Sequence, residues 1–277
     1  MRFGAPVFDD CSTPELWVQA VQKQGYRAAL CPASLQTPDD EVRLWAQAAA
    51  QADIAIAEVG AWSNPLSPDE DERRRATEKC TQSLDLAERL GARCCVNIVG
   101  SRSAQWDGPH PDNMSEETFD MIVQSVRGII DAVQPKRAFY VIETMPWIFP
   151  DSPDNYLRLL QAIDRPMLGV HLDPANMMNS PQRFFSNADF IRECFAKLGP
   201  YVRSCHGKDI ALGTHLTVHL DEVRPGLGGL DYHVFLSELN KVDPDATLLL
   251  EHLPNEIEYS MAAQYVRSVA QEIGIAL

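Results

Sequence analysis

The chain has 277 residues, 45% of them hydrophobic, which is enough for a large α/β domain with a substantial core. Acidic residues outnumber basic ones by 39 to 24, and the net charge of −15 disfavours nucleic acids and anionic membranes as partners. No apolar run approaches the roughly 20 residues that span a bilayer, and the first ten residues turn acidic too early for a typical signal peptide, so a cytoplasmic protein is expected.

Short apolar runs alternate with longer amphipathic stretches along the chain. In order, the strand-like runs lie at residues 2–6, 27–31, 54–59, 94–99, 138–142, 167–172, 201–205 and 247–250. Stretches with the apolar spacing of helices lie after these runs. They begin at the cap-like segment 12–15 and at residue 37, and then cover about 69–90, 115–133, 153–163, 187–198, 232–240 and 259–273. The pattern is therefore strand, helix, strand, helix throughout.

Eight strand–helix units of this kind predict one (β/α)8 TIM barrel that forms a single domain over residues 1–277. The strand-like runs are apolar along nearly their whole length, as strands of a parallel sheet covered on both faces are. A doubly wound open sheet is the alternative. No GxGxxG motif follows the first strand, which disfavours the dinucleotide-binding form of that fold.

Side chains capable of binding a metal end each of the last four predicted barrel strands: Glu143, Asp173, His206 and Glu251. Active sites of such barrels are built where the strands end, so these four side chains are expected to converge. A lone carboxylate at a strand end is usually a loop residue or a helix cap, but four matching positions favour a shared ligand set. Three carboxylates and one imidazole form a hard site that favours Mn²⁺, Mg²⁺ or Co²⁺.

Other residues near strand ends are candidates for substrate binding. Glu58, at the end of the third strand, would bond a substrate hydroxyl or act as a structural loop carboxylate. His171 shares the inward face of Asp173 and would contact substrate, support the site or be a satisfied core histidine. Trp62 and Trp147 follow strand ends and would stack on a sugar or pack within their loops.

Lys208 lies two residues after His206, on the same side if the strand continues. Its ammonium would bind a substrate oxygen or pair with a neighbouring carboxylate. His252 follows Glu251 directly and is expected to point away from the metal. The long loop at residues 100–113 would cover a pocket or a partner, and the glycine run at 225–229 is expected to be a flexible loop.

Four segments resemble, in order and spacing, motifs of the xylose-isomerase-like TIM-barrel superfamily of sugar isomerases and epimerases: Glu143–Trp147, His171–Asn176, His206–Asp209 and Leu250–Glu251. The resemblance covers essentially the whole barrel. It implies that the four strand-end residues bind one divalent ion, with Mn²⁺ expected first and Mg²⁺, Co²⁺ or Zn²⁺ as alternatives. It also implies that Arg224 contacts substrate, and Asn176 joins the expected substrate contacts.

The family resemblance implies a sugar isomerase or epimerase that acts on a ketose or related keto-polyol. The ion would chelate two substrate oxygens and stabilise an enediolate. Glu143 and Glu251, on opposite sides of the ion, would remove and return the proton. Loss of a β-hydroxyl from the same intermediate would instead make the protein a lyase or dehydratase of a keto-sugar or inosose. A small carbohydrate-like partner is expected, and homo-oligomerisation is left open.

Two further alternatives are disfavoured by particular residues. A DNA-cleaving enzyme of the AP-endonuclease type needs more histidines, but Asn176 stands where one of them lies, and His219 and Asp221 come in a different order. A non-catalytic sugar-binding barrel would have no reason to keep four ionisable groups together. Many ketose epimerases also carry a carboxylate about six residues after the strand-five glutamate, where this chain has Phe149, so a more apolar pocket end is expected.

Overall fold

The computed structural model describes residues 1–277, and it confirms the predicted TIM barrel. Eight parallel strands follow one another around the barrel in the order β1-β10-β7-β6-β5-β4-β3-β2. Their bounds are β1 (Arg2–Gly4), β2 (Ala28–Leu30), β3 (Ala55–Gly60), β4 (Cys94–Asn97), β5 (Phe139–Glu143), β6 (Leu168–Leu172), β7 (Val202–Gly207) and β10 (Thr247–Leu250).

The sheet closes between its first two strands, which lie at opposite ends of the strand order. The amide of Arg27 donates a hydrogen bond of 3.0 Å to the carbonyl of Phe3. A Cβ on Gly4 would lie 2.0 Å from the carbonyl oxygen of Ala28, so only glycine permits this approach. The barrel is therefore nearly closed by direct backbone contact.

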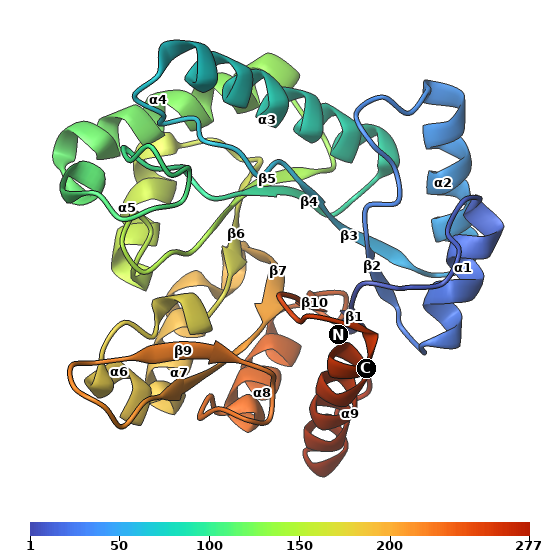
Figure 1. The fold of residues 1–277 in the computed structure, drawn as a ribbon. Helices are drawn as coiled ribbons and strands as arrows, with labels where there is room; N and C mark the ends of the chain where they lie inside the picture. Colours follow the sequence, from blue (N-terminus) through green and yellow to red (C-terminus); the bar gives the residue numbers. More distant parts are fainter.

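Helices surround the strands, as Figure 1 shows. The eight expected helices are α1 (Pro14–Lys23), α2 (Asp39–Gln51), α3 (Glu70–Leu90), α4 (Glu116–Val133), α5 (Pro153–Ile163), α7 (Asn187–Leu198), α8 (Tyr232–Val242) and α9 (Glu256–Glu272). Short additional helices are α6 (Pro181–Phe185), η1 (Pro111–Met114), η2 (Ala175–Met177) and η3 (Gly199–Tyr201). Side-chain caps begin several of them. Thr13 accepts a bond from the Leu16 amide at the start of α1, and Ser152 accepts one from Asn155 at the start of α5.

A two-stranded antiparallel hairpin, β8 (Asp209–Leu212) and β9 (Leu220–Val223), follows β7 and was not predicted. The expectation of a flexible glycine loop after it is wrong. The Asp209 carboxylate accepts bonds of 2.8–3.1 Å from four backbone amides: Ile210, Gly226, Gly228 and Leu230. A Cβ on Gly228 would lie 2.2 Å from Asp209 Oδ1. The glycine run therefore folds tightly around one carboxylate.

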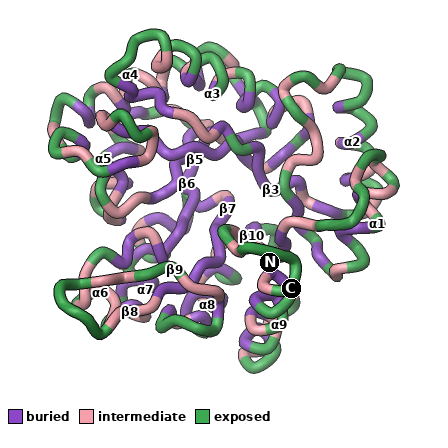
Figure 2. Tube along the Cα trace, viewed as in Figure 1, coloured by how far each residue is buried: buried purple, intermediate pink, exposed green.

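The main core lies between the strands and the surrounding helices and contains 64 buried apolar residues. Figure 2 shows the buried chain concentrated along the barrel strands. Polar side chains are also buried inside the barrel, among them Glu58, His171, Ser204 and Thr247. Burying such groups costs free energy unless they are paired, so their partners indicate what this end of the barrel does. None of the helices is both long and apolar enough to cross a membrane.

Candidate metal centre

The structure brings the four strand-end residues together at the carboxyl-terminal rim of the barrel. Glu143 ends β5, Asp173 follows β6, His206 lies near the end of β7 and Glu251 follows β10. The side chains of the first three are buried, and that of Glu251 is 18% exposed. One ligand atom from each residue lies within 4.8 Å of the ligand atoms of the other three. Strand direction in the closed sheet thus gathers residues that are distant in the sequence.

The donor set fits a divalent ion. Oxygen and imidazole ligands lie about 2.0–2.6 Å from hard cations, so two ligands of one ion are at most about twice that distance apart. Asp173 Oδ2 and Glu251 Oε1 are buried and receive no well-directed hydrogen bond. His206 Nδ1 lies 3.2 Å from Glu143 Oε1 and 2.8 Å from Glu251 Oε1. Buried acceptors in this arrangement require cations nearby.

Lys208 supplies one cation to this cluster. Its side chain is 1% exposed, and Nζ lies 2.9 Å from Asp173 Oδ2 and 3.5 Å from Glu143 Oε1, with a further ion pair to Glu251 Oε1. Burial by itself would lower the pKa of Lys208, but the three carboxylates raise it well above its usual value. Of the two roles considered for this residue, the structure places its ammonium against the carboxylates.

Glu58 and His206 form a buried pair behind the cluster. Glu58 Oε1 lies 3.1 Å from His206 Nε2, and Glu58 Oε2 lies 3.1 Å from His171 Nε2 and accepts a bond of 3.4 Å from Ser204. Burial opposes ionisation of Glu58, but the two histidines outweigh it and lower the pKa of Glu58 to about 2. An ionised Glu58 can accept a hydrogen bond from His206 Nε2–H, which leaves Nδ1 directed at the cluster.

A cavity of about 530 Å³ opens onto the cluster. Of the expected substrate contacts, it is lined by Glu58, Trp62, Trp147, Asn176 and Lys208. Asn176 Nδ2 donates to Glu143 Oε1 and to the Thr144 carbonyl, each at 3.1 Å. The Trp62 ring centroid lies 6.4 Å from that of the His206 imidazole. These positions are compatible with substrate contact, which stays a prediction.

Two expected substrate contacts do not reach the cavity. His171 is fully buried beneath Glu58, with its ring centroid 4.0 Å from that of His206, and is not among the lining residues. Arg224 Nε pairs with Glu258 Oε2 on α9 at 2.8 Å, and Arg224 is absent from the lining as well. A direct substrate role for either residue would require a rearrangement that the structure does not show.

His252 is not among the candidate metal-binding groups, but it contacts one of them from the rim of the cavity. Its Nε2 is 3.5 Å from Glu251 Oε2, its Nδ1 is 3.1 Å from Glu222 Oε2, and the residue lines the cavity. β10 ends at Leu250 and His252 adopts a left-handed backbone conformation with φ of 57°, so strand alternation does not determine the direction of its side chain. His219 and Asp221 lie outside the cluster, in the turn between β8 and β9 and on β9 respectively.

The loop at residues 100–113 and several apolar residues complete the cavity, and most of them were missed from the sequence. Trp106 and Asp107 of that loop line it, and the carbonyl of Asp107 accepts a bond of 2.8 Å from Trp147 Nε1. Phe149 was expected to make one end of the pocket apolar, but it does not contribute to the cavity wall. Phe149 packs against Phe119 at a centroid distance of 5.6 Å and does not line the cavity.

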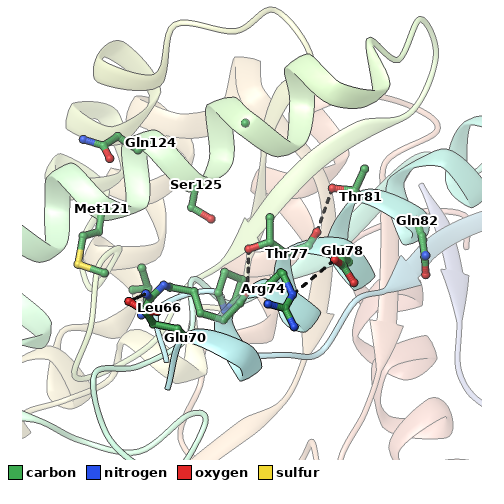
Figure 3. Close-up of a pocket in the computed structure, with 13 residues that line it drawn as sticks. Leu66, Glu70, Arg74, Thr77, Glu78, Thr81, Gln82, Met121, Gln124 and Ser125 are labelled. Atoms are coloured by element: carbon green, nitrogen blue, oxygen red, sulfur yellow. Dashed lines mark hydrogen bonds and ion pairs between the residues drawn. The ribbon is translucent and has the colours of Figure 1, made fainter. Parts of the chain in front are cut away.

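A larger cavity, of about 670 Å³, lies elsewhere. It is an open groove between α3 and α4, shown in Figure 3 with Glu70, Arg74, Thr77, Glu78 and Ser125 along its walls. Arg74 in this groove forms ion pairs with Asp71 and Glu78 of the same helix, and the groove contains none of the candidate metal-binding groups. The smaller cavity at the strand ends is therefore the candidate active site.

Comparisons with known proteins identify the family and the fold. A family model described as xylose isomerase-like TIM barrel matches residues 18–269. Similar solved structures include D-psicose 3-epimerase from Clostridium cellulolyticum in complex with D-tagatose, at 15% identity, with 100% of both chains covered and a TM-score of 0.70. A probable 3-DHS dehydratase from Bacillus anthracis shows 17% identity, covers 98% of this chain and 99% of its own, and has a TM-score of 0.70.

A third similar structure is a xylose isomerase-like TIM barrel protein from Mycobacterium smegmatis in complex with magnesium. It is 14% identical, the match covers 94% of this chain and 89% of that one, and the TM-score is 0.67. A search of curated proteins found no match. At these identities the solved structures establish the fold alone.

Proposed function

Because this chain belongs to the xylose isomerase-like TIM barrel family, we propose that it is a metal-dependent isomerase or epimerase of a ketose or related keto-polyol. The observation that carries the proposal is the convergence of Glu143, Asp173, His206 and Glu251 on one point beside a cavity. These four residues would hold the ion, for which Mn²⁺ is the first choice and Mg²⁺, Co²⁺ and Zn²⁺ are the alternatives. A bound divalent ion supplies a Lewis acid for a carbonyl oxygen.

Glu143 and Glu251 are the groups proposed to move protons. They come from β5 and β10, which two other strands separate in the barrel, so they reach the centre from different sides. One carboxylate would remove the proton from the carbon next to the carbonyl, which gives an enediolate, and the other would return it. Return to the opposite face of the same carbon is epimerisation, and return to the neighbouring carbon is isomerisation.

The other residues of the centre would orient these two bases. Asn176 donates to Glu143 Oε1, and Lys208 pairs with oxygens of Glu143 and Glu251, so both carboxylates are held in place. Glu58 fixes the His206 ring from behind. Trp62 and Trp147 would stack against the sugar and exclude water from the reacting carbons.

Dehydration is the second candidate function, and His252 is the observation that favours it. This residue lines the cavity 3.5 Å from Glu251, where it could protonate a departing hydroxyl. A similar structure is a probable 3-DHS dehydratase. Elimination begins with the same proton removal, so both reactions would use one set of residues.

Deuterium exchange tests the proposal. We expect the Mn²⁺-loaded protein to incorporate carbon-bound deuterium from D₂O into a ketose or keto-polyol substrate, detected by NMR. Glu143→Gln and Glu251→Gln should each lower the rate at least a hundredfold, because each loses a proton-transfer group and a negative ligand. Glu117→Gln, on the exposed start of α4, is the matched control.

The products of the same incubation distinguish the candidates. An epimer or isomer supports the first function, whereas an unsaturated or diketo product that absorbs ultraviolet light supports dehydration. Wild-type rates in both glutamine variants would contradict the assigned roles. Metal analysis of the purified protein would identify the ion that it carries.

A further inference from the structure

A second cavity adjoins the cavity at the metal centre. Its volume is about 550 Å³, and Pro146, Trp147 and Asn176 line both cavities. Asn176 also donates to Glu143 Oε1, so the boundary between the cavities lies one side chain from the metal centre. A ligand that fills the first cavity and passes Asn176 would enter the second.

Apolar side chains form much of the second cavity. Met178 follows η2, Ile210 lies on β8 and Leu220 on β9, and Val218 stands in the turn between these strands. Val218 is 54% exposed and Trp147 is 42% exposed. Water against such walls is unfavourable, and an apolar group that replaces it gains free energy in proportion to the area covered.

The first cavity also has both charged and apolar lining residues. Apart from Asp107, its charged lining residues belong to the metal centre or contact it, and the rest of the lining includes the apolar residues Leu30, Ile98, Trp106 and Met145. A free ketose carries a hydroxyl on every carbon except the carbonyl carbon, and hydroxyls facing these apolar residues would lose hydrogen bonds to water without replacement. A substrate with a polar part at the metal centre and an apolar part against the apolar residues fits this lining better.

We infer that the substrate is a glycoside whose keto-sugar part occupies the metal-centre cavity and whose apolar, aromatic aglycone extends past Asn176 into the second cavity. Each cavity falls within the roughly 300–1,000 Å³ that holds a drug-sized ligand, so one sugar ring leaves most of this space unfilled. Trp147, which lines both cavities, would contact the ligand at the junction of its two parts. The inference rests on the proposed function for the nature of the sugar part.

Binding of two matched ligands tests the inference. The phenyl and methyl glycosides of one hexose that carries a free ketone on a ring carbon other than the anomeric carbon are titrated into the Mn²⁺-loaded protein by isothermal calorimetry. We expect the phenyl glycoside to bind at least tenfold more tightly, because its ring covers the walls of the second cavity. Val218→Asp places a charge in that cavity alone, so it should remove most of this advantage and leave the methyl glycoside unaffected. Leu44→Asp, at an equally exposed position on α2, should change neither constant.

Equal affinities of the wild-type protein for the two ligands would overturn the inference, as would an advantage that persists in Val218→Asp or the failure of both ligands to bind. Deuterium exchange into the same ligands is measured separately. The expected binding pattern without exchange would support the second subsite and contradict the proposed function. Exchange without a preference for the phenyl ligand would support the proposed function and contradict the second subsite.

Discussion

Lys208 would share its carboxylate partners with a bound divalent ion. Its Nζ contacts Asp173 Oδ2, Glu143 Oε1 and Glu251 Oε1, the oxygens that the ion needs. Replacing Lys208 with methionine removes a positive charge a few ångströms from the ion and leaves a side chain of similar length. We therefore expect Lys208→Met to lower the dissociation constant for Mn²⁺ at least tenfold, measured by calorimetry.

The same substitution should lower thermal stability in the presence of EDTA, because three buried carboxylates then lose a cationic partner. Lys23→Met is the matched control, since Lys23 is exposed on α1 and far in sequence from the cluster. Unchanged or weaker Mn²⁺ binding by Lys208→Met would show that the ammonium does not compete with the ion.

Glu58 controls which nitrogen of His206 faces the cluster. As a carboxylate it can accept a hydrogen bond from Nε2–H, whereas a glutamine amide at this position can donate to Nε2 and favour a proton on Nδ1. We expect Glu58→Gln to weaken Mn²⁺ binding by about 10- to 100-fold, as losses behind metal-bound histidines commonly do. Binding within twofold of wild type would refute this role. Glu78→Gln, exposed on α3, serves as the control.

Residues at strand ends were predictable from the sequence because the barrel fixes where strand ends meet. Each of the four candidate ligands stands at the end of an apolar run, and closure of the sheet brings these strand ends together: Glu143, Asp173, His206 and Glu251. The link between Glu58 and His206 was not predictable, because it joins β3 to β7 across the barrel interior and depends on side-chain rotamers. The contacts of His252 were not predictable from alternation, because its left-handed backbone ends the alternation of the strand.

Among the elements, the loop around Asp209 requires a glycine at position 228. A Cβ on Gly228 would lie 2.2 Å from Asp209 Oδ1 and 2.4 Å from the Ile210 carbonyl oxygen. We expect Gly228→Ala to lower the free energy of unfolding by about 1–3 kcal/mol, because the backbone must move and lose bonds to the carboxylate. Urea unfolding measures the loss, and faster hydrogen exchange at the Gly226 and Leu230 amides would locate it.

Gly128→Ala is the control for this substitution. Gly128 lies within α4, and a Cβ there meets no atom within 4 Å. Alanine favours helix over glycine by about 1 kcal/mol, so this variant should be neutral or more stable. Equal losses in the two variants would mean that the Asp209 contacts contribute nothing specific.

The barrel elements were predictable because apolar runs and helical periodicity are strong along most of the chain. All eight strands and their eight helices lie within a few residues of the expected positions. The β8–β9 hairpin was missed because its strands are four residues each and β9, with the sequence LDEV, has no apolar alternation. What holds this region is the Asp209 carboxylate, and a single acidic residue gives no periodic signal.

For the molecule as a whole, the metal centre ties together strands from one half of the barrel. β5, β6, β7 and β10 each contribute one group, so a bound ion would stabilise the folded state against the unfolded chain. At an Mn²⁺ concentration 100 times the dissociation constant, the gain is about 2.7 kcal/mol. We expect the Tm to rise by roughly 5–10 °C over that in EDTA, measured by scanning calorimetry.

Glu251→Gln should show a smaller rise in Tm, because one anionic ligand is lost while the barrel is unchanged. An equal rise in Tm in this variant and in the wild-type protein would show that the ion binds at a site other than this cluster. That residues 1–277 form a single domain stays a prediction, which one cooperative calorimetric transition would support.

One contact at the cavity concerns the passage of molecules into and out of the site. The bond from Trp147 Nε1 to the Asp107 carbonyl joins the loop after β5 to the loop after β4, and both residues line the cavity. A neutral hydrogen bond of this kind contributes only about 1 kcal/mol net. Thermal motion can therefore break this bond frequently and separate the two loops. A molecule can then enter or leave the cavity while both loops stay folded and the barrel strands stay paired.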